Sequence, residues 1–275
     1  MEYKNLPNLA SYVTALMASG RLSFTPEEAQ AALGIERGAF LDAAEKLQKR
    51  RQILTPRRGF YVAVPPQFLN LEGPPPSFFI DDLMRQIAAN YYVGLLKAAE
   101  LHGAAHQAVM EFQVVAEKQI PAMKTGRGRI FFYFRRDFDA VTGGIEQRNT
   151  DTGTMKVSSP ELTILDLLRY PQGSGGLDNI VTVVDELAPN ADADKLGGLC
   201  PAFERAVVQR TGYLLNKAGF DDLAEKMRAS LAEGPALQWV ELDPSLARDP
   251  DLTPEVVERD KHWRVLVRRY PERDL

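Results

Sequence analysis

Apolar residues at helical spacing open the chain. They recur at intervals of three and four residues, as on one face of a helix, and they are Leu9, Tyr12, Val13, Leu16 and Met17. We expect Gly20 to end this helix. The next segment, "TPEE", places Thr25 before Pro26 and Glu28, the arrangement of a capping box with proline at the first helical position. It predicts a short helix to about Leu33.

A third helix and a hairpin follow. A glycine supplies a tight turn, and a helix is expected from about Glu36 to about Arg51. Its apolar positions, expected to face inward, are Phe40, Ala44 and Leu47. The β-prone runs "QILT" and "FYVAV" are joined by "PRRG", whose proline and glycine suit a turn. A helix-turn-helix followed directly by a hairpin is the order of elements in a winged helix.

The remainder of the chain mixes both periodicities. Residues from Ile80 to about Gln107 read as helical, whereas "EFQVVAEK", "GRIFFYFRR" and "GTMKVSS" are rich in β-branched and aromatic residues and predict strands. "SSPELTILDLLRYP" predicts a helix capped by Ser158 or Ser159. Further helices are expected at residues 177–187, 202–217 and 221–232. The expected fold class is α+β, with an N-terminal winged helix-turn-helix domain and a larger C-terminal α+β domain.

A proline-rich stretch separates these two parts. Five prolines lie in "VPPQFLNLEGPPPSFF", and proline lacks the backbone donor that helices and sheets need. We therefore expect a winged-helix domain at residues 1–66, a linker at residues 67–79 and an α+β domain at residues 80–275. Charge divides at the same place. Residues 1–66 carry a net +3 and the rest −7, within a total of −4, so the basic character belongs to the small domain.

The basic residues of the small domain are placed as a DNA-binding surface would need. In a winged helix the third helix enters the major groove, where Arg37 could bond a guanine edge. Asp42 and Glu45 also face outward. Phosphate contacts are expected from Lys46, Lys49, Arg50 and Arg51 at the end of that helix and from Arg57 and Arg58 at the wing tip.

Two other readings of the same residues stay open. Cations at a helix C-terminus also complement the helix dipole, and charged residues often form only a solvated face. Winged helices in addition serve as protein-docking modules. The wing-tip cations Arg57 and Arg58 favour DNA, because they lie on a separate element expected to fold back beside the third helix.

A second basic run lies in the acidic part of the chain. No acid occurs between its first and last members, which are Lys118, Lys124, Arg127, Arg129, Arg135 and Arg136. Such a concentration could form a second nucleic-acid surface or a partner site. Exposed cations at the edge of a sheet would instead discourage aggregation. The segment "KHWRVLVRRYPER" near the C-terminus reads as an edge strand or a short helix.

Signals for catalysis are weak. His102 and His106 have the spacing of two metal ligands on a helix, but no third ligand is evident. "GSGG" and "DAD" resemble nucleotidyltransferase elements, yet the second follows a Pro-Asn turn and reads as a helix start capped by Asp192 or Asp194. Cys200 has no neighbouring histidine in sequence and reads as a buried apolar residue. We therefore expect no enzymatic activity, no metal and no cofactor.

Composition places the chain among folded proteins of the cytoplasm. Hydrophobic residues make up 45% and charged residues 25% of its 275 residues. No run approaches the roughly 20 apolar residues of a membrane span, and "MEYKNLPNL" lacks the pattern of a secretory signal. A single cysteine excludes an internal disulfide. We expect cytoplasmic localisation and no membrane partner.

Several phrases of the chain resemble one known family. "YYVGLLKAAELHGAAHQ", then "EFQVV", and later "SSPELTILDLLRYP" are similar to the AbiEi antitoxins of bacterial type IV toxin-antitoxin systems, which act in abortive infection and phage defence. "RGFYVAVPP" at the end of the predicted winged helix and the proline-rich connector add to the likeness. It extends from about Leu9 to about Arg169, and the tail from about Gln238 to Leu275 matches nothing comparable.

The resemblance implies a function and two partners. Such a protein would repress its own operon by binding inverted repeats in its promoter, as double-stranded DNA, through the winged helix. Its C-terminal domain would counteract a nucleotidyltransferase toxin, with which it need not form a stable complex. The alternative is an antitoxin that neutralises the toxin by direct binding, without sequence-specific DNA binding.

Overall fold

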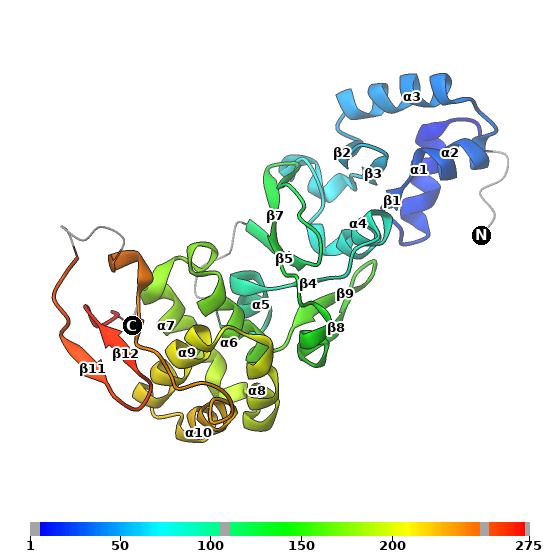
Figure 1. Ribbon diagram of the computed structural model, residues 1–275. Coiled ribbons are helices and arrows are strands. Elements are labelled where there is room, and N and C mark those ends of the chain that lie inside the picture. The colour runs from blue at the N-terminus through cyan, green and yellow to red at the C-terminus, as the bar shows by residue number, and fades with distance from the viewer. Residues whose placement is uncertain (1–5, 105–110, 248–252, 273–275) are drawn as a thin grey trace. The chain divides into compact units, whose positions relative to one another are not determined.

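The computed structural model describes residues 6–104, 111–247 and 253–272 and shows two compact units. Unit 1 consists of Met1–Tyr92, Met110–Arg136 and Gln147–Lys156. Unit 2 consists of Val93–Val109, Asp137–Glu146 and Val157–Leu275. The mixture of helices and sheets confirms the α+β class (Figure 1). The proline-rich segment lies within unit 1. The expected division into residues 1–66, 67–79 and 80–275 stays a prediction.

Unit 1 begins with the predicted winged-helix order of elements. These are α1 (Leu9–Ala18), β1 (Ser23–Phe24), α2 (Pro26–Leu33), α3 (Arg37–Lys49), β2 (Ile53–Arg57) and β3 (Phe60–Ala63). The hairpin β2–β3 gains a third strand that the sequence did not predict, because β1 pairs antiparallel with β3 and gives the order β1-β3-β2. Thr25 caps α2 in a complete capping box with Glu28, and Gly34 ends the helix in the left-handed region, as expected.

Aromatic side chains build the core of this module. Phe24 stacks on Tyr61 with ring centroids 5.5 Å apart, and Tyr12 meets Phe24 edge-on at 5.6 Å. Phe40 of α3 meets Tyr61 edge-on at 5.3 Å. Such pairs contribute about 0.5 to 1.5 kcal/mol beyond the area they bury. The third helix is therefore fixed on the small sheet by its buried face, and its other face points to solvent.

The proline-rich segment packs within unit 1 as short helical turns. It forms two 3-10 helices, Pro66–Leu71 and Pro76–Phe78, and leads into α4 (Ile80–Ile87). Gly73 lies so close to Leu54 of β2 that a Cβ at this glycine would be 2.4 Å from the leucine Cδ2. The segment is thus in contact with the wing of the winged helix.

A six-stranded mixed sheet follows, in the order β6-β7-β5-β4-β9-β8. Its strands are β4 (Tyr91–Val93), β5 (Glu111–Ala116), β6 (Met123–Thr125), β7 (Gly128–Phe134), β8 (Ile145–Thr150) and β9 (Gly153–Ser158). Strand β5 is parallel to β7, and β6 joins β7 as an antiparallel hairpin. The expected helix from Ile80 to Gln107 is wrong, because the chain forms α4, then β4, then α5 (Leu95–Leu101). All three residues of β4 are buried, so its apolar run has no alternation to distinguish it from a helix.

Unit 2 is mainly helical. Its longer helices are α6 (Pro160–Arg169), α7 (Gly176–Leu187), α8 (Ala193–Leu199), α9 (Arg205–Lys217) and α10 (Asp221–Ser230), with a 3-10 helix at Asp139–Gly144. Ser159 caps α6 and Asp192 caps α8, as expected. The buried Glu161 accepts a hydrogen bond from the Asp192 amide at 2.8 Å and pairs with Lys195 at 3.2 Å. Although burial disfavours the carboxylate, these partners and Ser159 hold the pKa of Glu161 below its usual value.

The C-terminal segment forms a small sheet on this helical unit. Its strands are β10 (Val240–Glu241), β11 (Glu258–Asp260) and β12 (Val265–Val267), in the order β10-β12-β11, with a 3-10 helix at Pro244–Ala247. The segment "KHWRVLVRRYPER" thus supplies a central strand, which corrects the expected edge strand or helix. Trp263, 1% exposed, packs where Gly212 leaves α9 without a side chain. In the described ranges, no helix has the length and apolarity needed to cross a membrane.

Candidate nucleic-acid interface

Helix α3 presents a mixed face to solvent. Phe40, Ala44 and Leu47 are buried, as predicted. Arg37 begins the helix and is exposed, and Leu41, one turn later, is 47% exposed. The exposed face therefore offers a guanidinium and an apolar side chain, the groups that contact guanine edges and thymine methyls in major grooves.

The end of α3 carries the four cations expected there. Lys46, Lys49, Arg50 and Arg51 are all exposed. Lys49 pairs with Glu45 at 2.6 Å along the helix, and the hydrogen bond between them is the main reason that the pKa of Glu45 is lowered. Arg51 has a φ of +58°, and the Gln52 amide bonds the Leu47 carbonyl at 2.9 Å, so the helix ends in a tight left-handed turn.

The wing tip holds Arg57 and Arg58, both exposed. The strand register shifts between Leu54 and Arg57, and Gly59 has a φ of +80°, which closes the turn behind the two arginines. Gln86 of α4 donates to the Gly59 carbonyl at 2.7 Å and so holds this turn from outside the winged helix. The structure thus brings the wing arginines and α3 into one module, as the sequence predicted.

The second basic run divides into parts with different surroundings. Lys124, Arg127 and Arg129 are exposed on the hairpin formed by β6 and β7, and we refer to these three as the hairpin cations. Lys118 instead donates to the Ala88 carbonyl at 2.6 Å, at the end of α4. Arg135 is 0% exposed, so its expected place on an exposed basic surface is wrong. Arg136 is exposed directly after β7.

Three residues that the sequence did not single out support this surface. Glu72 of the connector pairs with Arg51 at 3.3 Å and lies 4.0 Å from Arg127. Gln48 donates to Thr55 at 2.6 Å, which ties α3 to β2. Gln86 is the third, at the wing turn. Glu72 and Gln86 contact residues that are remote in sequence, and the bond from Gln48 to Thr55 depends on how α3 packs on β2. No short sequence motif could therefore have identified these three residues.

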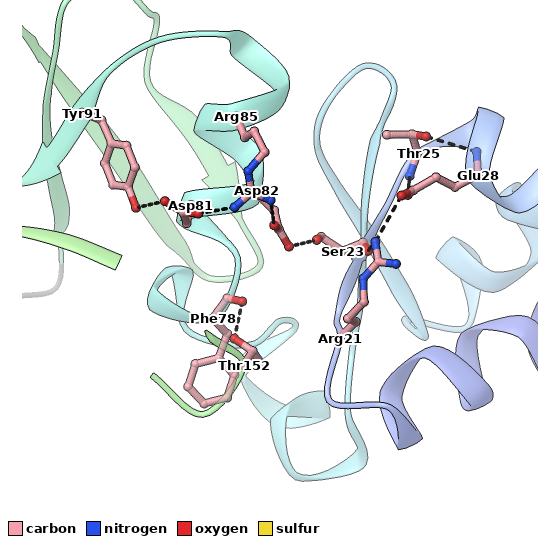
Figure 2. Close-up of polar contacts among 10 residues, drawn as sticks. All are labelled: Arg21, Ser23, Thr25, Glu28, Phe78, Asp81, Asp82, Arg85, Tyr91 and Thr152. Carbon is pink, nitrogen blue, oxygen red and sulfur yellow. Dashed lines mark hydrogen bonds and ion pairs between the residues drawn. The ribbon is translucent and has the colours of Figure 1, made fainter. Parts of the chain in front are cut away.

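Figure 2 shows a chain of polar contacts in unit 1. Arg85 bonds Asp81 at 2.5 Å and Asp82 at 2.7 Å, and Asp82 accepts from the Ser23 hydroxyl of β1. The Tyr91 hydroxyl donates to Asp81 at 3.0 Å. Burial, and next the charge of Asp81, raise the pKa of Tyr91 well above its ordinary value. Through Asp82 this network links α4 to the winged helix, and both Asp81 and Asp82 have partners within unit 1.

Three residues that were candidates for catalysis, His102, Asp192 and Cys200, have structural roles in the described part of the chain. His102 bonds the Ser158 carbonyl at 2.7 Å, whereas His106 lies outside the described residues. Cys200 is buried, which raises the pKa of its thiol to about 11. Asp192 accepts from the Lys195 amide at 2.8 Å as the cap of α8. Over the ranges that the structure covers, no three histidine, cysteine or acidic residues are grouped as metal ligands would be.

Comparison with solved structures shows the fold. The crystal structure of the RV2827C protein from Mycobacterium tuberculosis matches with a TM-score of 0.63 and 16% identity, covering 93% of this chain and 89% of that one. At this identity the likeness shows a shared fold. An antigenic nucleotidyltransferase-like protein from Paracoccidioides brasiliensis matches with a TM-score of only 0.34 and 14% identity, over 55% of this chain and 89% of that one. A score this low supports no argument about fold or function.

Comparison with known sequences finds a family match in the middle of the chain. No curated protein matches the chain. The family model described as the AbiEi antitoxin C-terminal domain matches residues 92–217, a range that runs from β4 to the end of α9. The match confirms the resemblance predicted from the phrases around Tyr91 and Ser158. Over residues 92–217 the chain is therefore similar to the C-terminal domain of AbiEi antitoxins.

Proposed function

We propose that the protein is an antitoxin that binds DNA through its winged helix and represses its own operon. One observation carries the DNA part: six of the seven predicted cations cluster at the end of α3 and at the wing tip, Arg37 begins α3, and all seven are exposed. In a winged helix these two elements face the duplex. The matched AbiEi domain supports the antitoxin part.

The roles of the cations follow from their positions. Arg37, near the start of the helix, would reach base edges in the major groove and contribute to sequence preference. The cations at the end of α3 and the wing arginines would bind phosphates, which strengthens binding to every sequence alike. The matched domain would counteract a nucleotidyltransferase toxin, and the cytoplasm is the expected site of action.

The decisive experiment is a titration of labelled duplex from the region upstream of the protein's own coding sequence. Replacing Arg57 and Arg58 by Ala should weaken binding to this duplex and to a scrambled one equally, whereas Arg37→Ala should also reduce the preference between them. A matched control replaces Arg259 and Lys261, two exposed cations of unit 2, by Ala. Wild-type protein that shows no preference for the upstream duplex would overturn the repressor function.

A second measurement addresses the toxin. If a nucleotidyltransferase toxin is encoded beside this protein, co-expression of the two should restore the growth of cells that the toxin arrests, and the two proteins need not co-purify. A stoichiometric complex that survives high salt, from a protein that does not bind the upstream duplex, would replace this proposal with the direct-binding antitoxin.

A further inference from the structure

Two basic segments far apart in the chain meet in unit 1. The end of α3 carries Arg51, and the β6–β7 hairpin carries Arg127. Both guanidinium groups approach the same carboxylate oxygen, Oε1 of Glu72, at 3.3 and 4.0 Å. Strand β6 of this hairpin is in contact with β2 of the wing. The hairpin cations therefore continue the basic surface of the winged helix.

The junction between the two segments is closely packed. Gly126, at the tip of the hairpin, has a φ of +64°, and a Cβ there would lie 2.7 Å from the backbone of Leu71 and Glu72. The Arg127 amide donates to the Leu71 carbonyl at 3.2 Å. On the other side of the connector, Gly73 is in contact with Leu54 of β2. These contacts fix the hairpin relative to the wing, so cations on both elements can bind one rigid ligand together.

The hairpin also carries an excess of positive charge. Lys124 and Arg129 are directly opposite one another in the register of β6 and β7. Like charges at opposed positions repel. No carboxylate of the described residues lies within ion-pair distance of either side chain, and Arg127 has only the shared Glu72. A bound anion would relieve this repulsion.

We propose that the hairpin cations form a second phosphate-binding element that extends the DNA contact of the winged helix along the duplex backbone. This inference rests on the proposed function. Its occupant is the phosphate backbone of the same duplex, because the surface is continuous with the end of α3 through Glu72. We assign phosphate contacts and no base reading to this element, because its exposed charged groups are long flexible cations, which suit contacts to the backbone.

The test is the salt dependence of binding to the upstream duplex. Each phosphate contact contributes about 0.9 to the slope of log K against log salt, so the variant with Lys124, Arg127 and Arg129 replaced by Gln should lose about 2.7 from the slope. Hydroxyl-radical footprinting should show protection lost on one flank of each bound repeat. The matched control replaces Lys226, Arg259 and Lys261 of unit 2 by Gln, which removes equal charge from exposed positions.

The outcomes are distinguishable. An unchanged slope in the hairpin variant, together with a reduced slope in the Arg57→Ala, Arg58→Ala variant, overturns the inference and leaves the proposed function standing. Aggregation of the hairpin variant, with an unchanged salt slope in its monomeric fraction, likewise overturns the inference. It would indicate that the hairpin cations protect the edge of the sheet from aggregation. Wild type without specific DNA binding overturns both. The single variant Arg127→Gln changes one exposed turn residue and should lose about 0.9 from the slope, so the test does not depend on the triple variant folding.

Discussion

Replacing Gly126 by Ala tests the junction that holds the hairpin against the connector. The substitution adds one methyl group in a backbone conformation that L-residues rarely adopt, at φ +64°. Gly20 provides a matched control, because its φ is +79° and a Cβ there would have no neighbour within 4 Å. Both variants have the same conformational cost, and only Gly126→Ala adds a collision.

The magnitude follows from these two terms. An alanine in the left-handed region costs about 1 to 2 kcal/mol. The added Cβ at position 126 would lie 2.7 Å from backbone atoms of Leu71 and Glu72, which cannot rotate away as a side chain could. Overpacking of this kind costs about 1 to 3 kcal/mol more. We expect Gly20→Ala to lose about 1 to 2 kcal/mol of unfolding free energy and Gly126→Ala about 2 to 5 kcal/mol.

Two measurements check this expectation. Thermal unfolding followed by circular dichroism should place the midpoint of Gly126→Ala below that of Gly20→Ala. Native-state hydrogen exchange should show faster exchange of the Arg127 amide, whose bond to the Leu71 carbonyl is 3.2 Å in the wild type. Equal midpoints and an equally protected Arg127 amide would refute the close packing of hairpin and connector. The DNA titration of Gly126→Ala should in addition approach the shallow salt slope of the hairpin variant.

Three other substitutions have expected outcomes of their own. Gly212→Ala would place a Cβ 2.1 Å from the Trp263 ring, so it should destabilise unit 2 by about 1 to 3 kcal/mol and red-shift tryptophan fluorescence, while Gly198→Ala, with open space, should not. Glu161→Gln should destabilise by about 1 to 3 kcal/mol at neutral pH. The pKa of Glu161 is lower in the folded protein than in the unfolded chain. Its carboxylate therefore stabilises the fold above about pH 4.3, and this stabilisation is lost as the pH falls through the pKa of the folded protein. The variant should therefore lose less stability than wild type on acidification. Glu72→Gln should tighten DNA binding and steepen the salt slope by freeing two arginines, and weaker binding would show that Glu72 positions them instead.

Local rules explain which elements the sequence could predict. Thr25 and Glu28 satisfy a capping box within four residues, and Ser159 caps α6 with its own hydroxyl. The buried stripe of α3 follows from helical spacing alone. Each of these features is decided by neighbours in sequence, so a reader of the chain can find it.

Long-range packing decides the features that were missed. Strand β4 is apolar throughout, and only its neighbours β5 and β9 make it a strand. Arg135 reads as one more exposed cation, yet the fold buries it completely. Glu72 looks like a solvated acid in a proline-rich stretch. Its role depends on Arg51 and Arg127, which are remote in sequence and lie near Glu72 only in the folded chain.

The contacts around the connector bear on how the proposed repressor could change its operator. Leu54 against Gly73, Gln86 against Gly59, and Ser23 against Asp82 tie the winged helix to residues beyond it. A chimaera in which the winged helix of another protein is joined to this chain at the proline-rich segment would lose these contacts. Under the proposed function, new operator specificity would therefore be reached more readily by point substitutions on the exposed face of α3 than by exchange of the whole module.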